Sequence, residues 1–231
     1  MDGHGHRAAE HGPGRGTPVG RAASRCTGPS RGLWDSGPVP EPSGPDAPAG
    51  ATVWFTGLSG AGKSTLASGS RDRLTGLGYR AYHLDGDVLR TGLNADLGYD
   101  PASRDENVRR AGEVALILAS TGITVLAAFI SPFEAAREQV RRRHAAAGVP
   151  FFEVHISTPL ETCVARDPKH IYSQARSGRL TDVSGLDGDY EVPPHPDLRI
   201  ECVGDRDELI GTVVDRIVAW HGSPLVPSGT R

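Results

Sequence analysis

The sequence of 231 residues has little lysine, little cysteine and no long apolar run. Its longest apolar stretch, residues 123–130, is far shorter than the roughly 20 residues of a membrane-spanning helix, so no membrane segment is expected. Three widely spaced cysteines do not form the pattern of a disulfide framework or a zinc site, and they favour a cytoplasmic protein with free thiols. The 25 basic and 28 acidic side chains nearly cancel, which gives no extended field for nucleic acid or an anionic membrane. An anionic small-molecule ligand would therefore need a local pocket.

Composition divides the chain into a leader and a folded domain. Residues 1–50 contain 11 glycines and 8 prolines with almost no large apolar side chains, so they are predicted to form a disordered leader. They also lack the apolar core of a signal peptide. From residue 51 onward, short apolar runs alternate with amphipathic patterns, which is typical of strand–helix units and a mainly parallel sheet. We expect one α/β domain over residues 51–222 and a flexible tail over residues 223–231.

Five strands and four longer helices are expected in this domain. The strands lie near residues 51–56, 80–84, 123–129, 151–156 and 198–202, and the helices near residues 63–75, 108–118, 134–147 and 207–220. By contrast, residues 168–196 are rich in Gly, Asp, Pro and Arg and show no sustained periodicity. Long irregular segments in compact domains are often lids, so we predict a lid over about residues 166–196.

A glycine-rich segment after the first predicted strand fits the Walker A pattern. It reads Gly57-Leu58-Ser59-Gly60-Ala61-Gly62-Lys63-Ser64 and precedes a predicted helix, as the motif requires. Glycines allow backbone N–H groups to point at phosphate oxygens, Lys63 can reach the terminal phosphates of ATP, and Ser64 can ligate Mg²⁺. A glycine-rich turn that merely contains a lysine is the alternative, but lysine occurs only at Lys63 and Lys169 in this arginine-rich chain. The segment therefore predicts a site for ATP and magnesium.

Two carboxylates and several arginines follow the second predicted strand. Asp85 and Asp87 lie where ligands of open parallel sheets gather, beyond the carboxyl ends of the strands. They can orient an acceptor hydroxyl, accept its proton or hold magnesium, although an Asx turn with a helix cap fits the spacing equally well. The arginines are Arg90, Arg104, Arg109 and Arg110. Their forks suit phosphate or sulfate oxyanions, and each is also compatible with a solvated surface charge.

Several runs of this sequence resemble the adenylylsulfate kinase family. They are Asp85-Gly-Asp-Val-Leu-Arg90-Thr-Gly-Leu-Asn94, Asp96-Leu-Gly-Tyr99, Arg104-Asp-Glu-Asn107-Val-Arg-Arg and Phe129-Ile-Ser131-Pro132-Phe133, with lid matches at Asp167-Pro-Lys169, Tyr172, Ala175-Arg176 and 185–191. The match covers about residues 51–220 in order. It implies a three-layer P-loop kinase fold, usually a homodimer, that transfers the γ-phosphate of ATP to the 3′-hydroxyl of adenosine 5′-phosphosulfate. The product would be 3′-phosphoadenosine 5′-phosphosulfate, the activated form of sulfate.

The resemblance also implies roles for individual positions. For ATP these are Gly57, Ser59, Gly60, Ala61, Gly62, Lys63, Ser64 and Thr65, with Ser64 and Asp87 at the magnesium. For the nucleotide acceptor they are Asp85, Arg90, Tyr99, Arg104, Asn107, Ile130, Ser131, Lys169 and Val183, with Asp85, Asp87, Lys63 and Ser131 catalytic. Asp85 is the expected base. Ser131 matches a serine associated with a phosphoserine intermediate in some members, but direct transfer needs none, and a hydrogen-bonding role at a strand end fits at least as well.

The departures from the family pattern concern the acceptor side. Val183 replaces a lid phenylalanine that stacks on the acceptor base, Glu134 replaces an arginine, Val88 an asparagine and Ser173 a common lysine. A related kinase that acts on another nucleotide, such as cytidine diphosphoramidate, therefore stays open as an alternative. A GTPase-like switch is a second alternative, but the chain has no Asn-Lys-x-Asp motif. An inactive scaffold is a third, and the intact Walker A segment and paired aspartates argue against it.

Overall fold

A computed structural model describes residues 50–221, which adopt an α/β fold. Its strands are β1 (Ala51–Thr56), β2 (Ala81–Asp85), β3 (Thr124–Ala128), β4 (Phe151–Ile156) and β5 (Leu198–Ile200). They form one parallel sheet in the order β2-β3-β1-β4-β5. Each matches a predicted strand closely, so the predicted parallel sheet is confirmed. The predicted leader, apart from residue 50, and the predicted tail lie outside the described residues.

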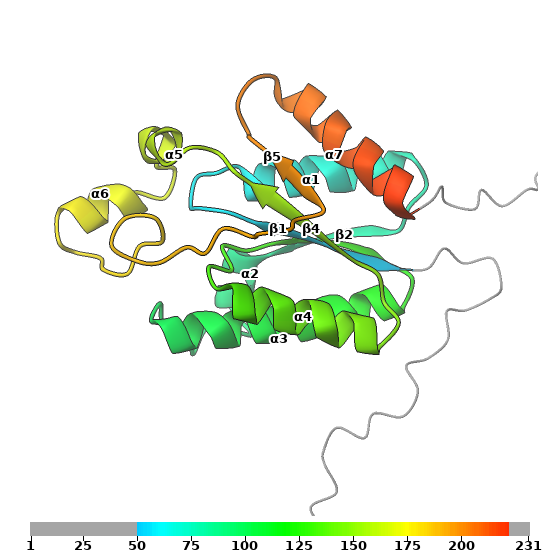
Figure 1. The fold of residues 1–231 in the computed structure, drawn as a ribbon, viewed down its shortest axis with the longest axis horizontal. Helices are drawn as coiled ribbons and strands as arrows, with labels where there is room; N and C mark the ends of the chain where they lie inside the picture. Colours follow the sequence, from blue (N-terminus) through cyan, green and yellow to red (C-terminus); the bar gives the residue numbers. More distant parts are fainter. Residues whose placement is uncertain (1–49, 222–231) are drawn as a thin grey trace, which may run out of the picture. The chain divides into compact units, whose positions relative to one another are not determined.

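Helices cover both faces of the sheet, which gives three layers (Figure 1). The helices are α1 (Lys63–Gly76), α2 (Gly86–Arg90), α3 (Pro101–Ser120), α4 (Glu134–Ala146), α5 (Leu160–Arg166), α6 (Ile171–Arg176) and α7 (Arg206–His221). In Figure 1, α1 and α7 lie on one face of the sheet, and α3 and α4 lie on the other. This is the layered arrangement that the sequence predicts. Within residues 50–221, no helix combines the length and apolar character needed to cross a membrane.

Strand β1 contributes to the core on both sides of the sheet. All six of its residues are buried, as expected of a central strand in a parallel sheet. Because successive side chains point to opposite faces, Val53 and Phe55 pack with α1 and α7, whereas Trp54 packs with α3 and α4. The Trp54 ring also stacks on Phe129, with ring centroids 5.0 Å apart. The two cores fix β1, so the loop that follows it begins from a firmly packed strand.

The lid segment contains more regular structure than the sequence indicates. Helix α6 lies within residues 168–196, and the carboxylate of Asp167 accepts a hydrogen bond from the backbone N–H of Tyr172 in its first turn at 3.1 Å. A helix of six residues makes fewer than two turns, which is too short for a periodic apolar pattern. The prediction of a wholly irregular lid is therefore wrong over α6. Helices α2 and α5, which are similarly short, are absent from the predicted set for the same reason.

Candidate active site

The loop between β1 and α1, here called the glycine loop (residues 57–62), depends on glycine for its shape. Gly57, Gly60 and Gly62 have φ angles of 151°, 72° and 106°, values that other residues rarely adopt. A Cβ atom at Gly62 would also lie 2.5 Å from the Sγ atom of Cys202. The loop runs directly into the N-terminus of α1, where unpaired N–H groups and the helix dipole favour an anion. This backbone is suited to phosphate.

Hydrogen bonds from two buried hydroxyl groups attach the glycine loop to the segments around it. The hydroxyl of Thr158 donates to the carbonyl of Ala61 at 2.9 Å, and the hydroxyl of Tyr172 donates to the carbonyl of Ser59 at 2.9 Å. Tyr172 is buried and belongs to α6. The beginning of the lid is therefore joined directly to the glycine loop.

Lys63 is a buried cation at the start of α1. Its side chain is 9% exposed, and its Nζ atom donates a hydrogen bond to the carbonyl of Leu58 at 2.7 Å. Burial, followed by the nearby positive charge of Lys169, lowers the pKa of Lys63 to about 8. Lys63 therefore keeps most of its charge at neutral pH and can attract an anion.

Asp85 links Ser64, in the first turn of α1, to the start of α2. Its Oδ2 atom accepts a hydrogen bond from the hydroxyl of Ser64 at 2.6 Å, and its Oδ1 atom accepts one from the backbone N–H of Asp87 at 2.8 Å. Burial raises the pKa of Asp85, but these hydrogen bonds, together with the nearby His83 and Lys169, outweigh burial, so the pKa of this carboxyl lies below its usual value. Asp85 thus caps α2, as the turn alternative predicts, and still presents an ionised carboxylate oxygen to Ser64.

Asp87 faces the lid instead of the glycine loop. Its carboxylate forms an ion pair with Lys169, which lies just before α6. The sequence-based prediction places Asp87 with Ser64 at a magnesium ion, whereas Asp85 is the carboxylate hydrogen-bonded to Ser64 in the structure. The two aspartates therefore contact different parts of the site.

A cavity of about 870 Å³ brings most of the predicted site residues together. The predicted ATP residues that line it are Ser59, Gly60, Gly62, Lys63, Ser64 and Thr65. The predicted acceptor residues that line it are Asp85, Arg90, Tyr99, Arg104, Asn107, Ile130, Ser131, Lys169 and Val183, and Asp87 lines it as well. Gly57 and Ala61 are buried and do not line it. The glycine loop and the predicted acceptor residues thus share one space.

The four candidate arginines divide into two pairs. Arg90 and Arg104 line the cavity, and they donate hydrogen bonds at 2.6–3.1 Å to the backbone carbonyls of Leu97, Gly98, Tyr99 and Asp182. Arg109 and Arg110 form ion pairs with Glu106 and do not line the cavity. A carbonyl partner leaves the positive charge of a guanidinium available to an oxyanion, whereas a carboxylate partner neutralises it. Of these four arginines, Arg90 and Arg104 therefore suit an anionic acceptor.

Ser131 follows β3 in a strained conformation. Its φ angle is 40°, and a positive value at a residue other than glycine costs about 1–3 kcal/mol. Its hydroxyl accepts a hydrogen bond from Nε1 of Trp54 at 3.0 Å, and the residue is 2% exposed. These contacts fit a hydrogen-bonding role at the end of a strand. A phosphoserine intermediate at this position stays a prediction.

The departures from the family pattern lie mostly away from the cavity. Val88, Glu134 and Ser173 do not line it, and Val88 is 64% exposed. Val183 does line it, but its side chain is 4% exposed and belongs to the same apolar core as Tyr172. Val183 is therefore the one departure, within residues 50–221, that can contact an acceptor in this cavity.

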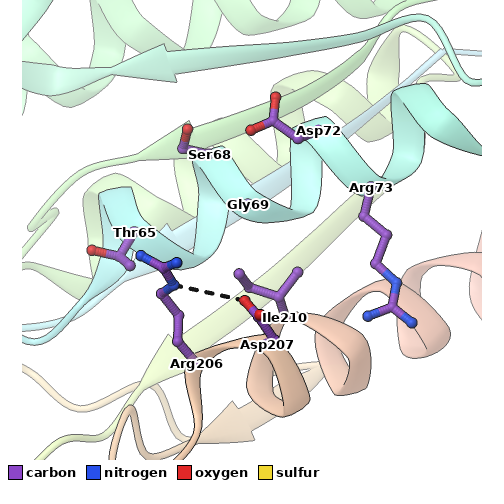
Figure 2. Close-up of a pocket in the computed structure, with 8 residues that line it drawn as sticks. All are labelled: Thr65, Ser68, Gly69, Asp72, Arg73, Arg206, Asp207 and Ile210. Atoms are coloured by element: carbon purple, nitrogen blue, oxygen red, sulfur yellow. Dashed lines mark ion pairs between the residues drawn. The ribbon is translucent and has the colours of Figure 1, made fainter.

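A second hollow of about 630 Å³ lies between α1 and α7 (Figure 2). Thr65 and Arg206 line both hollows. Figure 2 shows Arg206 extending from α7 toward α1, with an ion pair of 3.7 Å to Asp207. The hollow is lined by two acidic side chains, Asp72 and Asp207, and by two basic ones, Arg73 and Arg206. Its charges balance and the glycine loop does not line it, so it lacks the features of a second phosphate site.

Comparison with known proteins identifies the family. A family model described as Adenylylsulphate kinase matches residues 49–201. An adenylyl-sulfate kinase from Clostridium acetobutylicum is 46% identical over 171 residues, which cover 74% of this chain and 82% of that one. The chain belongs to the adenylylsulphate kinase family.

A curated sequence and a solved structure from Mycobacterium tuberculosis are also similar to this chain. The bifunctional enzyme CysN/CysC is 49% identical over 168 residues, which cover 73% of this chain but 27% of the relative, so this chain spans about a quarter of that protein's length. A solved structure of the Mycobacterium tuberculosis APS kinase CysC in complex with AMPPNP and APS matches with a TM-score of 0.72 and 49% identity. That match covers 74% of this chain and 98% of the other. The P-loop kinase fold predicted from the sequence is confirmed.

Sequence reasoning misses one wall of the cavity. This wall contains Arg166, Cys202, Gly204, Arg206 and Leu209. Arg166 donates hydrogen bonds to the carbonyls of Cys202 at 2.5 Å and Gly60 at 3.4 Å, so it joins the end of α5 to the glycine loop and to the β5–α7 connection. No motif marks the β5–α7 connection. Of these wall residues, only Arg166 could have been found from the sequence, because it directly precedes a run that resembles the family's lid.

Proposed function

We propose that this protein transfers the γ-phosphoryl group of ATP to the 3′-hydroxyl of adenosine 5′-phosphosulfate (APS). One observation carries the proposal: the glycine loop and the acceptor-side arginines line a single cavity, and Asp85 lines it as well. Phosphoryl transfer depends on holding the donor phosphate and the acceptor hydroxyl in line, with charges placed to stabilise the transferring group. A shared cavity with these residues meets that requirement, and family membership favours APS as the acceptor.

On the donor side, the N–H groups of the glycine loop and Lys63 bind the phosphates of ATP in this proposal. When bound, Mg²⁺ neutralises charge on the β- and γ-phosphates. Among the described residues, no group of three or more His, Cys, Asp or Glu side chains could hold a metal ion. Magnesium in kinases needs no such group, since it takes one or two protein ligands together with phosphates and water. The oxygens of Ser64 and Asp85, 2.6 Å apart, fit this need, with Asp87 as the further predicted ligand.

On the acceptor side, Asp85 orients the 3′-hydroxyl and accepts its proton in this proposal. Its lowered pKa keeps the carboxylate ionised at neutral pH, as a base requires. Arg90 and Arg104 bind the oxygens of the phosphosulfate, because their charge is not neutralised by a carboxylate. Asn107 and Lys169, which also line the cavity, complete the proposed acceptor contacts.

A coupled ADP-release assay tests the proposal. With ATP, Mg²⁺ and APS, the protein should release ADP and form a 3′-phosphorylated product that mass spectrometry identifies. The Lys63→Ala variant should form neither product. The acceptor panel should also contain cytidine diphosphoramidate and unsulfated nucleoside phosphates. If the protein phosphorylates another nucleotide but not APS, APS is not its acceptor, although the protein is still a kinase. If it hydrolyses ATP at the same rate without any acceptor, a GTPase-like switch is the better description.

We also infer that the chain forms a homodimer, as the resemblance implies. Val88, Leu93 and Tyr99 are apolar residues that are each more than half exposed on or after α2, and such exposed groups are candidates for an interface. Size-exclusion chromatography with light scattering measures the oligomeric state, and a monomer at all concentrations would contradict this inference. The cytoplasmic location stays a prediction that cell fractionation can test.

A further inference from the structure

Arg137 is a buried arginine on α4 that the proposed chemistry does not use. It is 3% exposed and does not line the cavity. Its guanidinium contacts three separate segments: Nε pairs with Oε1 of Glu153 on β4 at 3.1 Å, Nη1 donates to the carbonyl of Ser131 at 2.7 Å, and Nη2 donates to the carbonyl of Glu191 at 2.7 Å. A buried charge is costly unless it is paired and hydrogen-bonded. One rigid guanidinium with these three partners therefore fixes the spacing between them.

The contact with Ser131 holds the acceptor wall. Ser131 and its neighbour Ile130 line the cavity, and Ser131 has the positive φ of 40°. Such a conformation persists only when surrounding contacts hold it. Two strong contacts do so here, because Trp54 donates to the hydroxyl at 3.0 Å and Arg137 donates to the carbonyl.

The contact with Glu191 holds the end of the lid. The backbone N–H of Glu191 donates to the carbonyl of Pro132 at 2.8 Å, and the carboxylate of Glu191 accepts a hydrogen bond from the N–H of Glu134 at 2.6 Å. The preceding residue, Tyr190, shares a hydrogen bond of 3.0 Å with the hydroxyl of Thr56 on β1. The lid therefore returns to the sheet at Tyr190 and Glu191, directly beside Ser131.

From this geometry we propose that Arg137 is a positioning residue for the acceptor, which couples the docked end of the lid to the cavity wall at Ser131. The inference rests on the proposed function, because it concerns the acceptor of that reaction. Lysine cannot replace Arg137 in this role, since its single nitrogen lacks the planar fork that reaches three partners at once. If the coupling is lost, Ser131 can relax from its strained conformation and the lid end is less well fixed. Acceptor binding should weaken, while the glycine loop is unaffected.

Arg137→Lys tests this proposal, and Arg141→Lys is the matched control. Arg141 lies one turn further along α4 and pairs with the same Glu153 at 3.2 Å, but its other ion pair is with Asp197. We expect Arg137→Lys to raise the KM for APS about tenfold and to change the KM for ATP less than about twofold. Arg141→Lys should change neither. Equal increases in both KM values, or the same APS effect in Arg141→Lys, would overturn the proposal.

Hydrogen exchange on the ligand-free protein gives a second readout that does not depend on activity. In Arg137→Lys, the amides of residues 129–134 and 189–193 should exchange faster than in the wild type and in Arg141→Lys. Unchanged exchange in both segments would overturn the coupling. If Arg137→Lys does not fold, the double variant Arg137→Gln/Glu153→Gln takes its place. The double variant removes both charges of the Arg137–Glu153 ion pair, so no unpaired charge stays buried. If the wild type does not phosphorylate APS, the proposed function fails, and exchange alone decides the role of Arg137.

Discussion

The two halves of the cavity are built from different kinds of contact. The donor half depends on consecutive residues, since the glycines of residues 57–62 set the backbone and α1 begins immediately after them. The acceptor half depends on side chains whose partners are far away in the sequence. Arg104 donates to the carbonyl of Asp182, 78 positions away, and Arg137 donates to the carbonyl of Glu191, 54 positions away. The donor half should therefore respond mainly to changes in its own residues and in the two hydroxyls that hold its carbonyls, those of Thr158 and Tyr172. The acceptor half should respond mainly to changes that loosen the far end of the lid.

The largest effect that would test this contrast is expected from Lys63→Ala. The substitution removes the buried cation of the donor half without altering a glycine, so the fold should persist. We expect kcat/KM to fall by about 10³-fold, because a preorganised charge on the transferring phosphoryl group is lost. Steady-state kinetics and the thermal midpoint measure the two quantities. Lys169→Ala, at the only other lysine, should cost less because Lys169 is half exposed and pairs with Asp87. Near-normal turnover in Lys63→Ala would show that Lys63 does not bind the phosphates of ATP.

The next largest effect is expected from Asp85→Asn, at the boundary between the halves. The amide oxygen can still accept a hydrogen bond, but the side chain can no longer accept a proton at neutral pH. We expect kcat to fall by about a hundredfold, with the affinity for ATP largely kept. Asp87→Asn removes a charge that faces Lys169 rather than Ser64, so it should lower kcat less than Asp85→Asn does. If ATP binding collapses in Asp85→Asn while the acceptor reaction is spared, Asp85 belongs to the donor half.

The same contrast explains which features could be predicted from the sequence. The five strands and the glycine loop are encoded in short contiguous segments, so periodicity and motif spacing predict them. Asp85 and Asp87 could be placed at the site because strand ends meet along one edge of a parallel sheet. Their different partners, Ser64 and Lys169, could not be predicted, because the spacing of two aspartates does not say which of them faces the lid.

Features that depend on long-range packing could not be predicted. Arg137 looks like one of several charged residues on an amphipathic helix, and only the structure shows that it is buried between Ser131 and Glu191. Only the structure shows that Arg90 and Arg104 line the cavity while Arg109 and Arg110 form ion pairs outside it. The cavity wall around Cys202 could not be predicted either. Conversely, Glu134 departs from the family pattern in sequence, yet it lies outside the cavity.

A smaller effect on stability is expected from acid, and the part of it that comes from His155 should act on the lid side. His155 on β4 is 4% exposed, and its ring stacks beside Tyr190 with centroids 6.0 Å apart. Burial, with the positive charges of Arg199 and Arg137, lowers the pKa of His155 to about 4. An unfolded histidine titrates near pH ~6.5, so the unfolded state takes up a proton first as the pH falls. The stabilising contribution is complete above about pH 6.5 and is lost as the pH falls toward 4, by roughly 2 kcal/mol.

Urea unfolding at pH 7 and pH 4.5 measures this contribution. His155→Gln should reduce the loss of stability between the two pH values, whereas His195→Gln, at an exposed position, should leave the loss unchanged. A wild-type pH dependence retained in His155→Gln would show that the acid sensitivity arises elsewhere. Faster hydrogen exchange at residues 189–193 at pH 4.5 would place the loosening at the lid end, as the comparison of the two halves predicts.

The smallest effect is expected from Val183→Phe, which restores the aromatic side chain that the family pattern has in the lid. A base stacked on an aromatic ring gains about 1–3 kcal/mol, but added volume at a packed position costs a similar amount, about 1–3 kcal/mol. Val183 is buried in the core and also lines the cavity, so the added ring should cost stability, and only part of it can turn toward the acceptor base. We therefore expect the KM for APS to fall by only about threefold, with a lower thermal midpoint and an unchanged KM for ATP.

Val183→Leu is the matched control, because it adds bulk without a ring. It should lower the thermal midpoint in the same way but should not improve the KM for APS. An equal improvement in both variants would assign the gain to apolar contact rather than stacking. Weaker APS binding in Val183→Phe would mean that the core has no room for a ring at this position. Val183 would then act on the acceptor half through packing against its neighbours, and the base of the acceptor would have to stack elsewhere in the cavity, where Tyr99 is 57% exposed and keeps one ring face against Arg90.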